Sequence, residues 1–271
     1  MIHMQITHSE LFSYLEKVFP LEYQEEYDNS GRQISFDNQT VTGIIVAMDL
    51  SPVVINEACE NNCNCIITHH PIFFKPLKNI SGKNITGSMV IACIQHKISV
   101  YAAHTNADAV CWDLLAKSLE LTDIELLFPD KRYNGIGYGA LGIYDNDLSL
   151  SDLLKKVSQI LQSNSIIYYG NSSKRIKKVA CLQGTGSRKI NAVIGLGAVD
   201  CIITGDVGYH DAVSANNNGV AVIDIGHYAS EKPIIDFLYH TIHNYLTKEM
   251  HCNDIPLMIS KKEKNPMKCG M

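Results

Sequence analysis

Short apolar runs alternate with helical patterns along the first hundred residues of the chain. The runs at residues 43–48, 65–68 and 97–103 have the length and the β-branched content of buried strands. Helical patterns separate them, one beginning at Pro52, which suits the first position of a helix, and one over residues 88–96. This alternation of strand and helix predicts a parallel sheet with helical crossovers.

The pattern changes near residue 130, where a glycine-rich extended stretch at residues 135–142 is followed by an amphipathic helix. The earlier alternation resumes further along the chain. We therefore expect an α/β fold with a mostly parallel sheet. A smaller α/β module at residues 130–185 is expected to be inserted into a discontinuous domain formed by residues 1–129 and 186–271.

Two more strands are expected at residues 199–204 and 220–225, and the last long helix is expected to begin near Ser230. Residues 259–271 are rich in lysine and lack a periodic apolar pattern. We expect them to form a frayed tail.

Composition and charge narrow the class of protein. The chain has 271 residues, of which 46% are hydrophobic and 19% charged, with a net charge of −5, so no global basic field attracts nucleic acid. No apolar stretch approaches the roughly 20 residues of a membrane span, and the N-terminus does not resemble a secretory signal. The nine cysteines are scattered, which predicts buried reduced thiols and a cytoplasmic protein.

Two neighbouring histidines end the expected strand at residues 65–68. His69 and His70 meet Pro71, which stops the strand. The carboxyl ends of parallel strands face the crevice in which α/β proteins bind ligands. Adjacent residues of an extended chain point to opposite sides, so each imidazole could bind one of two metal ions. The alternative is that both are polar residues at a strand end.

The ends of two later strands carry a histidine followed four residues later by a carboxylate, which are further possible metal ligands. His104 follows the next strand, and Asp108 lies one helical turn further along, where its carboxylate could bridge two cations or could cap a helix. His227 and Glu231 are four residues apart, a spacing that places both on one helix face in position to chelate a metal. The alternative role of Glu231 is interaction with the helix dipole. Imidazole and carboxylate ligands suit Zn, Fe, Mn or Co.

Another strand end carries His210 beside Asp211, which could form a proton-transfer pair or support the metal ligands, or could lie on a helix surface. The glycine turn at residues 184–187 precedes a helix and could hold an anion through its backbone N–H groups. This is a weak motif because such turns are common.

In this order, several motifs resemble the NIF-three-like dinuclear-metal family, whose bacterial members are commonly labelled GTP cyclohydrolase 1 type 2 homologues. The motifs are Thr-His-His-Pro (68–71), His-Thr-Asn-Ala-Asp (104–108), Thr-Gly-Asp…His-Asp (204–211) and Gly-His-Tyr-Ala-Ser-Glu (226–231), with an N-terminal match at residues 27–34. Arg32, Ser35, Asp206 and Tyr209 depart from the residues usual in the family.

The resemblance implies two intertwined α/β domains, a toroidal homohexamer and two divalent transition-metal ions per subunit. It implies that Asp108 contacts both ions and that His104 and His210 lie nearby. The metal ligands that it implies are His69, His70, Asp108, His227 and Glu231.

The leading functional hypothesis from the sequence is a metal-dependent hydrolase that converts GTP to formate and 7,8-dihydroneopterin triphosphate. In this hypothesis His210, with Asp211 or His104, moves protons. Lysine and arginine side chains near the motifs are candidates to bind the triphosphate, namely Lys75, Lys78, Arg188 and Lys189. The alternatives are hydrolysis of another nucleotide, a phosphoester or a damaged metabolite, and a metal-binding scaffold without catalysis.

Overall fold

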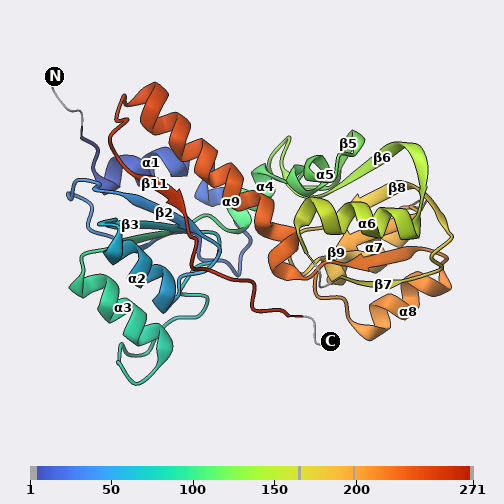
Figure 1. Ribbon diagram of the computed structural model, residues 1–271, viewed down its shortest axis with the longest axis horizontal. Coiled ribbons are helices and arrows are strands. Elements are labelled where there is room, and N and C mark those ends of the chain that lie inside the picture. The colour runs from blue at the N-terminus through green and yellow to red at the C-terminus, as the bar shows by residue number, and fades with distance from the viewer. Residues whose placement is uncertain (1–4, 164–165, 198, 269–271) are drawn as a thin grey trace. The chain divides into compact units, whose positions relative to one another are not determined.

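The computed structural model describes residues 5–163, 166–197 and 199–268. They form a mixed α/β fold with two sheets, as the sequence predicts (Figure 1). None of the helices in these ranges is long and apolar enough to cross a membrane.

The chain divides into two compact units. The first comprises residues 1–109 and 234–264, and the second residues 110–233 and 265–271. The segment 130–185, expected to be an inserted module, lies within the second unit together with the residues on either side of it.

The first unit contains a sheet of five strands in the order β1-β4-β3-β2-β11. All neighbours run parallel except β1, which pairs antiparallel with β4 at the edge. The strand bounds are β1 (Gly31–Ile34), β2 (Ile44–Ala47), β3 (Cys65–Thr68), β4 (Ser99–Ala102) and β11 (Leu257–Ile259). The three central strands are entirely buried, which explains their uniformly apolar sequences.

Helices cover both faces of this sheet (Figure 1). On one face, α2 (Pro52–Glu60) and α3 (Ile85–Gln95) contribute Val54 and Met89 to a core that includes Ile66 of the sheet. On the other face, Phe12 of α1 (His8–Val18) packs against Tyr101 of β4, with ring centroids 5.2 Å apart. Pro52 occupies the first turn of α2, as expected from the sequence, and Ser51 caps the helix.

The remaining helical segments of this unit follow α1, β4 and α9 in turn. They are η1 (Leu21–Tyr23), α4 (Thr105–Val110) and η3 (Tyr245–Glu249). The long helix α9 (His227–Asn244) begins in the second unit and ends in the first, and Pro233 lies within it at the division.

The second unit contains a sheet of six strands in the order β5-β6-β8-β9-β10-β7. Its neighbours β8, β9 and β10 are parallel, whereas β5, β6 and β7 pair antiparallel. The bounds are β5 (Thr122–Pro129), β6 (Gly137–Ser149), β7 (Ile167–Tyr169), β8 (Arg175–Cys181), β9 (Cys201–Thr204) and β10 (Ala221–Asp224).

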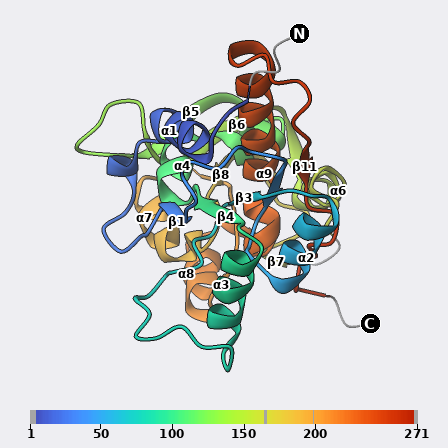
Figure 2. The ribbon, with the colours of Figure 1, turned by 90° about the vertical axis from the view of Figure 1, so that its left-hand side faces the viewer.

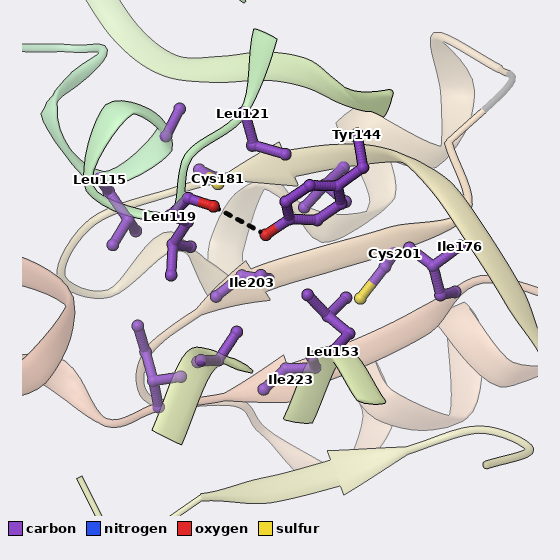
Figure 3. Close-up of a cluster of buried hydrophobic side chains, with 14 of the residues drawn as sticks. Leu115, Leu119, Leu121, Tyr144, Leu153, Ile176, Cys181, Cys201, Ile203 and Ile223 are labelled. Carbon is purple, nitrogen blue, oxygen red and sulfur yellow. Dashed lines mark hydrogen bonds between the residues drawn. The ribbon is translucent and has the colours of Figure 1, made fainter. Parts of the chain in front are cut away.

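Both faces of the second sheet are also covered. On one face Leu153 of α6 (Leu150–Leu161) and α5 (Leu114–Ser118) join a core with Ile203 and Ile223, and the Tyr144 hydroxyl donates a hydrogen bond of 2.9 Å to the Leu119 carbonyl (Figure 3). The opposite face packs against α7 (Ile190–Gly195) and α8 (Tyr209–Asn217), and η2 (Gly186–Lys189) precedes α7.

The prediction of a frayed C-terminal tail is wrong for its first residues. β11 extends the first sheet, and the Glu57 carboxylate accepts hydrogen bonds from Ser260 Oγ (2.6 Å) and Lys261 N (2.9 Å). The Glu263 carboxylate in turn accepts from the backbone N–H of Met48 and Asp49 at 2.9 and 2.8 Å. Residues 269–271 lie outside the described residues.

The cysteine prediction agrees with the structure for the described residues. Those cysteines are free thiols, and all but Cys59 are buried. Burial raises the pKa of Cys63 to about 11 and that of Cys93 to about 12, so both stay protonated near neutral pH.

Candidate metal-binding groups at the strand ends

In the first unit, the backbone ladder continues beyond the strands and fixes the start of each polar strand end. His69 N donates to the Ala47 carbonyl at 3.1 Å and His70 N to the Met48 carbonyl at 2.9 Å. These bonds hold both histidines on β3 at the edge where β2 and β4 also end. The sequence predicts that the candidate ligand side chains lie at one edge of the sheet. The structure explains why: these strands run parallel, so the residues that follow them meet at the same edge.

Three imidazoles meet at this edge. The ring centroids of His69 and His70 are 5.1 Å apart. The ring centroid of His104 lies 5.2 Å from that of His69 and 5.4 Å from that of His70. One ligand atom from each of these rings lies within 4.8 Å of the other two. Three nitrogen donors this close together could hold a metal ion.

Hydrogen bonds fix the orientation of the first two rings. His69 Nδ1 donates to the Ala103 carbonyl at 2.8 Å, and His70 Nδ1 donates to Asp49 Oδ1 at 2.9 Å. Because a neutral imidazole carries one N–H, a proton on Nδ1 places the lone pair on Nε2. Histidine ligands of metals are oriented in this way by a second hydrogen bond.

The third ring is held by a buried carboxylate. His104 Nδ1 donates to Asp28 Oδ1 at 2.7 Å, and Asp28 Oδ2 accepts from Thr105 N at 3.1 Å and from Ser30 Oγ at 2.7 Å. Burial of Asp28 acts to raise its pKa, but His104 and the hydroxyls of Thr105 and Ser30 outweigh it, so the pKa is lowered. Asp28 is therefore a carboxylate that keeps the His104 lone pair on Nε2.

Asp108 lies in α4, one turn after His104, as expected from the spacing. Its backbone N–H donates to the His104 carbonyl at 2.9 Å, so the helical turn itself brings the two residues together. Asp108 Oδ1 is 3.8 Å from His69 Nε2. The structure thus brings together the three predicted metal ligands of the first unit and His104.

In the second unit, the ends of β8, β9 and β10 carry another group. His227 is the first residue of α9, and its Nε2 lies 3.0 Å from Glu231 Oε2, which confirms the predicted shared helix face. His227 Nδ1 donates to Asp206 Oδ2 at 2.8 Å, and Thr185 Oγ1 donates to the same oxygen at 3.0 Å. The distance between His227 Nε2 and Glu231 Oε2 is close to the separation of about 3.3 Å expected for two ligands of one tetrahedral ion.

The glycine turn at residues 184–187 has a different partner from the one predicted. Gly184 has a φ of +60°, and a Cβ at this position would collide with the Glu231 carboxylate. The Gly184 N–H donates to Ser230 Oγ at 2.8 Å. The turn therefore allows a carboxylate to pack closely against the backbone, which makes the same place unfavourable for a bound anion.

His210 and Asp211 lie in the first turn of α8, and the His210 side chain is exposed. The His210 ring lies edge-on to Tyr209 with centroids 5.3 Å apart. Within the described residues, no hydrogen bond or ion pair joins His210 to His227 or Glu231. The proton-transfer role of His210 and Asp211 stays a prediction.

The donor set fits a divalent transition metal. Each of the four histidines has its Nδ1 hydrogen-bonded to a carbonyl or carboxylate oxygen and so presents its Nε2 lone pair. The neighbouring carboxylates of Asp108 and Glu231 supply oxygen ligands and negative charge. Imidazole nitrogen with carboxylate oxygen is a set suited to Zn, Fe, Mn or Co.

Sequence reasoning did not assign the aspartates that orient these rings. Asp49 directly follows an apolar strand, and Asp28 lies in the N-terminal motif, so each had a signal in the sequence. For Asp206 the sequence shows only a departure from the residue usual in the family. Its left-handed backbone, with a φ of 56°, turns its carboxylate to His227 and could not be read from residue order.

A family model for Duf34/NIF3 (NGG1p interacting factor 3) matches residues 6–266 of the chain. The chain belongs to the Duf34/NIF3 family. This confirms the resemblance drawn from the strand-end motifs.

Relatives of this family cover nearly the whole chain. A Clostridium acetobutylicum protein named GTP cyclohydrolase 1 type 2 homolog is 32% identical over 269 residues, covering 98% of this chain and 99% of that protein. A Helicobacter pylori protein named GTP cyclohydrolase 1 type 2 is 32% identical over 239 residues, covering 87% and 91%. The crystal structure of Staphylococcus aureus protein SA1388 matches with a TM-score of 0.88 at 27% identity, covering 97% of this chain and 99% of that one.

Proposed function

We propose that this chain is a dinuclear metal hydrolase of the GTP cyclohydrolase type, with His69, His70, Asp108, His227 and Glu231 as its metal ligands. The observation that carries the proposal is the common orientation of the histidines, whose Nδ1 atoms are all occupied by an oxygen acceptor. Surface histidines do not need this arrangement, whereas metal-ligating histidines almost always have it.

The proposed reaction opens the imidazole ring of GTP by attack of water at C8, releases formate, and recloses to 7,8-dihydroneopterin triphosphate. Two divalent ions (Zn, Fe, Mn or Co), when bound, would lower the pKa of a water and stabilise developing negative charge. The names of the relatives in Clostridium acetobutylicum and Helicobacter pylori support GTP as the first substrate to test.

His104 is the residue best placed to hold or move a proton beside the ligands. Asp28 keeps its Nδ1 protonated, so Nε2 can accept a proton from a group at the cluster and return it. The hydrogen bond to Asp28 also fixes the orientation of the ring. His210 with Asp211 is proposed as a second proton carrier.

Two measurements test the proposal. Metal analysis of the purified protein should find bound transition metal that is lost in His69→Ala and His227→Ala variants. Protein loaded with Zn, Fe or Mn should then release formate from GTP and produce pterin fluorescence, in an assay where a known cyclohydrolase is active. Metal binding without turnover of GTP would refute the cyclohydrolase reaction, while the proposed metal ligands would still be supported.

A substrate panel of other nucleotides and phosphoesters would then separate a different hydrolase from a scaffold without catalysis. We also propose a homohexamer and a cytoplasmic location. Size-exclusion chromatography with light scattering would test the oligomeric state.

A further inference from the structure

Two large aromatic side chains lie exposed beside the histidines of the first unit. Tyr27 is 64% exposed and Phe74 is 49% exposed, and their ring centroids are 6.4 Å apart. The Phe74 ring lies 5.6 Å from the His104 ring, at an interplanar angle of 68°. Exposed apolar groups gathered next to a candidate site commonly mark a surface that binds a ligand.

Hydrogen bonds hold this aromatic pair in place. The Phe73 carbonyl accepts from Asn29 Nδ2 at 2.9 Å, and Phe73 N donates to Gln33 Oε1 at 3.3 Å. Tyr27 directly precedes the buried Asp28 that orients His104. The backbone next to each aromatic ring is therefore anchored near the imidazole cluster, although both rings belong to connecting segments.

The loop after Phe74 adds positive charge. A long segment without helix or strand joins β3 to α3 (Figure 2). Lys75 and Lys78 of this segment are exposed, and no ion pair within the described ranges engages either ammonium group. The chain as a whole has a net charge of −5, so this is a local basic feature on an acidic protein. It would attract an anion to the same place as the aromatic rings.

We infer that Phe74 and Tyr27 form a stacking surface for the heterocyclic base of the substrate, while Lys75 and Lys78 bind its phosphates. This inference rests on the proposed function and specifies its substrate as an anionic nucleotide. Every base offers a π-face to an aromatic side chain, so such a surface selects a planar heterocycle without requiring hydrogen bonds to its edge.

The lysines favour a nucleotide over a protein partner. Lysine is depleted at the centres of protein–protein interfaces, where its charge loses solvent. A phosphate chain instead uses the ammonium groups directly and remains partly hydrated. The combination of aromatic rings with exposed cations therefore fits a nucleotide better than a second copy of the chain.

Calorimetric titration of the full-length metal-loaded protein tests the inference with three probes: GTP, guanosine and tripolyphosphate. Phe74→Ala should weaken binding of GTP and guanosine by roughly 5- to 150-fold and leave binding of tripolyphosphate unchanged. Lys78→Gln should weaken GTP and tripolyphosphate but not guanosine. Ile85→Ala is the matched control, because Ile85 is 62% exposed on α3 and should leave all three affinities unchanged.

Phe74→Leu separates stacking from simple burial, since it keeps an apolar side chain without a π-face and should lose most of the guanosine affinity. Equal binding of guanosine to the wild type and both Phe74 variants would overturn the inference. So would loss of a dimer or higher oligomer in Phe74→Ala, which would make the surface an interface between copies.

Failure of this inference and of the proposed function can be told apart. A fourth titration, with ATP, serves this purpose. If ATP binds with an affinity that depends on Phe74 and GTP does not bind, the stacking surface is supported and GTP is excluded as the substrate. If no nucleotide or nucleoside binds, the stacking surface is wrong, and metal analysis still decides the metal centre independently.

Discussion

Replacing Asp206 should reduce metal affinity much more than it reduces stability. Asp206 accepts a hydrogen bond from His227 Nδ1 at 2.8 Å, and removing the acceptor releases the ring from the tautomer that presents Nε2. Loss of such an orienting partner typically weakens metal binding about 10- to 100-fold, or about 1.4 to 2.8 kcal/mol. The side chains of His227 and Asp206 are 36% and 40% exposed, so this solvent-accessible hydrogen bond contributes only ~0–1 kcal/mol to folding.

The choice of substitution follows from the backbone. Asp206 has a φ of 56°, a conformation that glycine and asparagine tolerate, so Asp206→Gly removes the carboxylate without straining the chain. Asp206→Asn should lie between wild type and Asp206→Gly, because its amide oxygen can still accept from His227. Asp123→Gly is a matched control, since Asp123 is also an exposed aspartate with positive φ, 47°, at the start of β5.

The assay is competition for zinc between the protein and a chromophoric chelator at pH 7 and fixed ionic strength, together with a thermal melt. We expect weaker zinc binding in the order wild type, Asp206→Asn, Asp206→Gly, with Asp123→Gly equal to wild type. If folded Asp206→Gly competed for zinc as well as wild type does, the argument from ring orientation would be refuted.

Three further outcomes are expected. Tyr144→Phe should lower the free energy of unfolding by about 0.5–1.5 kcal/mol in a denaturant titration, because it removes a buried hydrogen bond (Figure 3). Gly184→Ala should weaken zinc binding in the same chelator competition, because its Cβ would displace the Glu231 carboxylate. Burial of Glu57 acts to raise its pKa, but its hydrogen bonds to residues 260–262 lower the pKa from the ordinary 4.5. The stability that this contact contributes is present above pH 4.5 and is lost as the pH falls through the lowered pKa. Limited proteolysis of the segment after β11 should therefore increase in acid. Glu57→Gln should show the increased cleavage already at pH 7.

The sequence was sufficient to predict the central strands and the ligand candidates because both depend on local order. The strands β2, β3 and β4 are buried on both faces, so each one is a continuous apolar run followed by a polar residue. The strands that were missed, β1, β5 and β11, are only partly buried and carry mixed sequences.

The contacts that order the tail and orient the histidines could not be predicted, because they join residues distant in sequence. Glu57 holds Ser260 from 203 positions away, and Asp28 holds His104 from 76 positions away. The hydrophobic periodicity of a segment does not indicate which distant residues it contacts. They depend on the sheet order, which places the end of β11 beside β2 and the end of β4 near the N-terminal motif.

Metal binding through Nε2 of these histidines underlies every role proposed for the two groups. The most direct test is an anomalous difference map from a crystal of the zinc-loaded protein. We predict peaks about 2.0–2.1 Å from Nε2 of His69, His70 and His227. Peaks at cysteine sulfur atoms, or none near these three nitrogens, would contradict the claim.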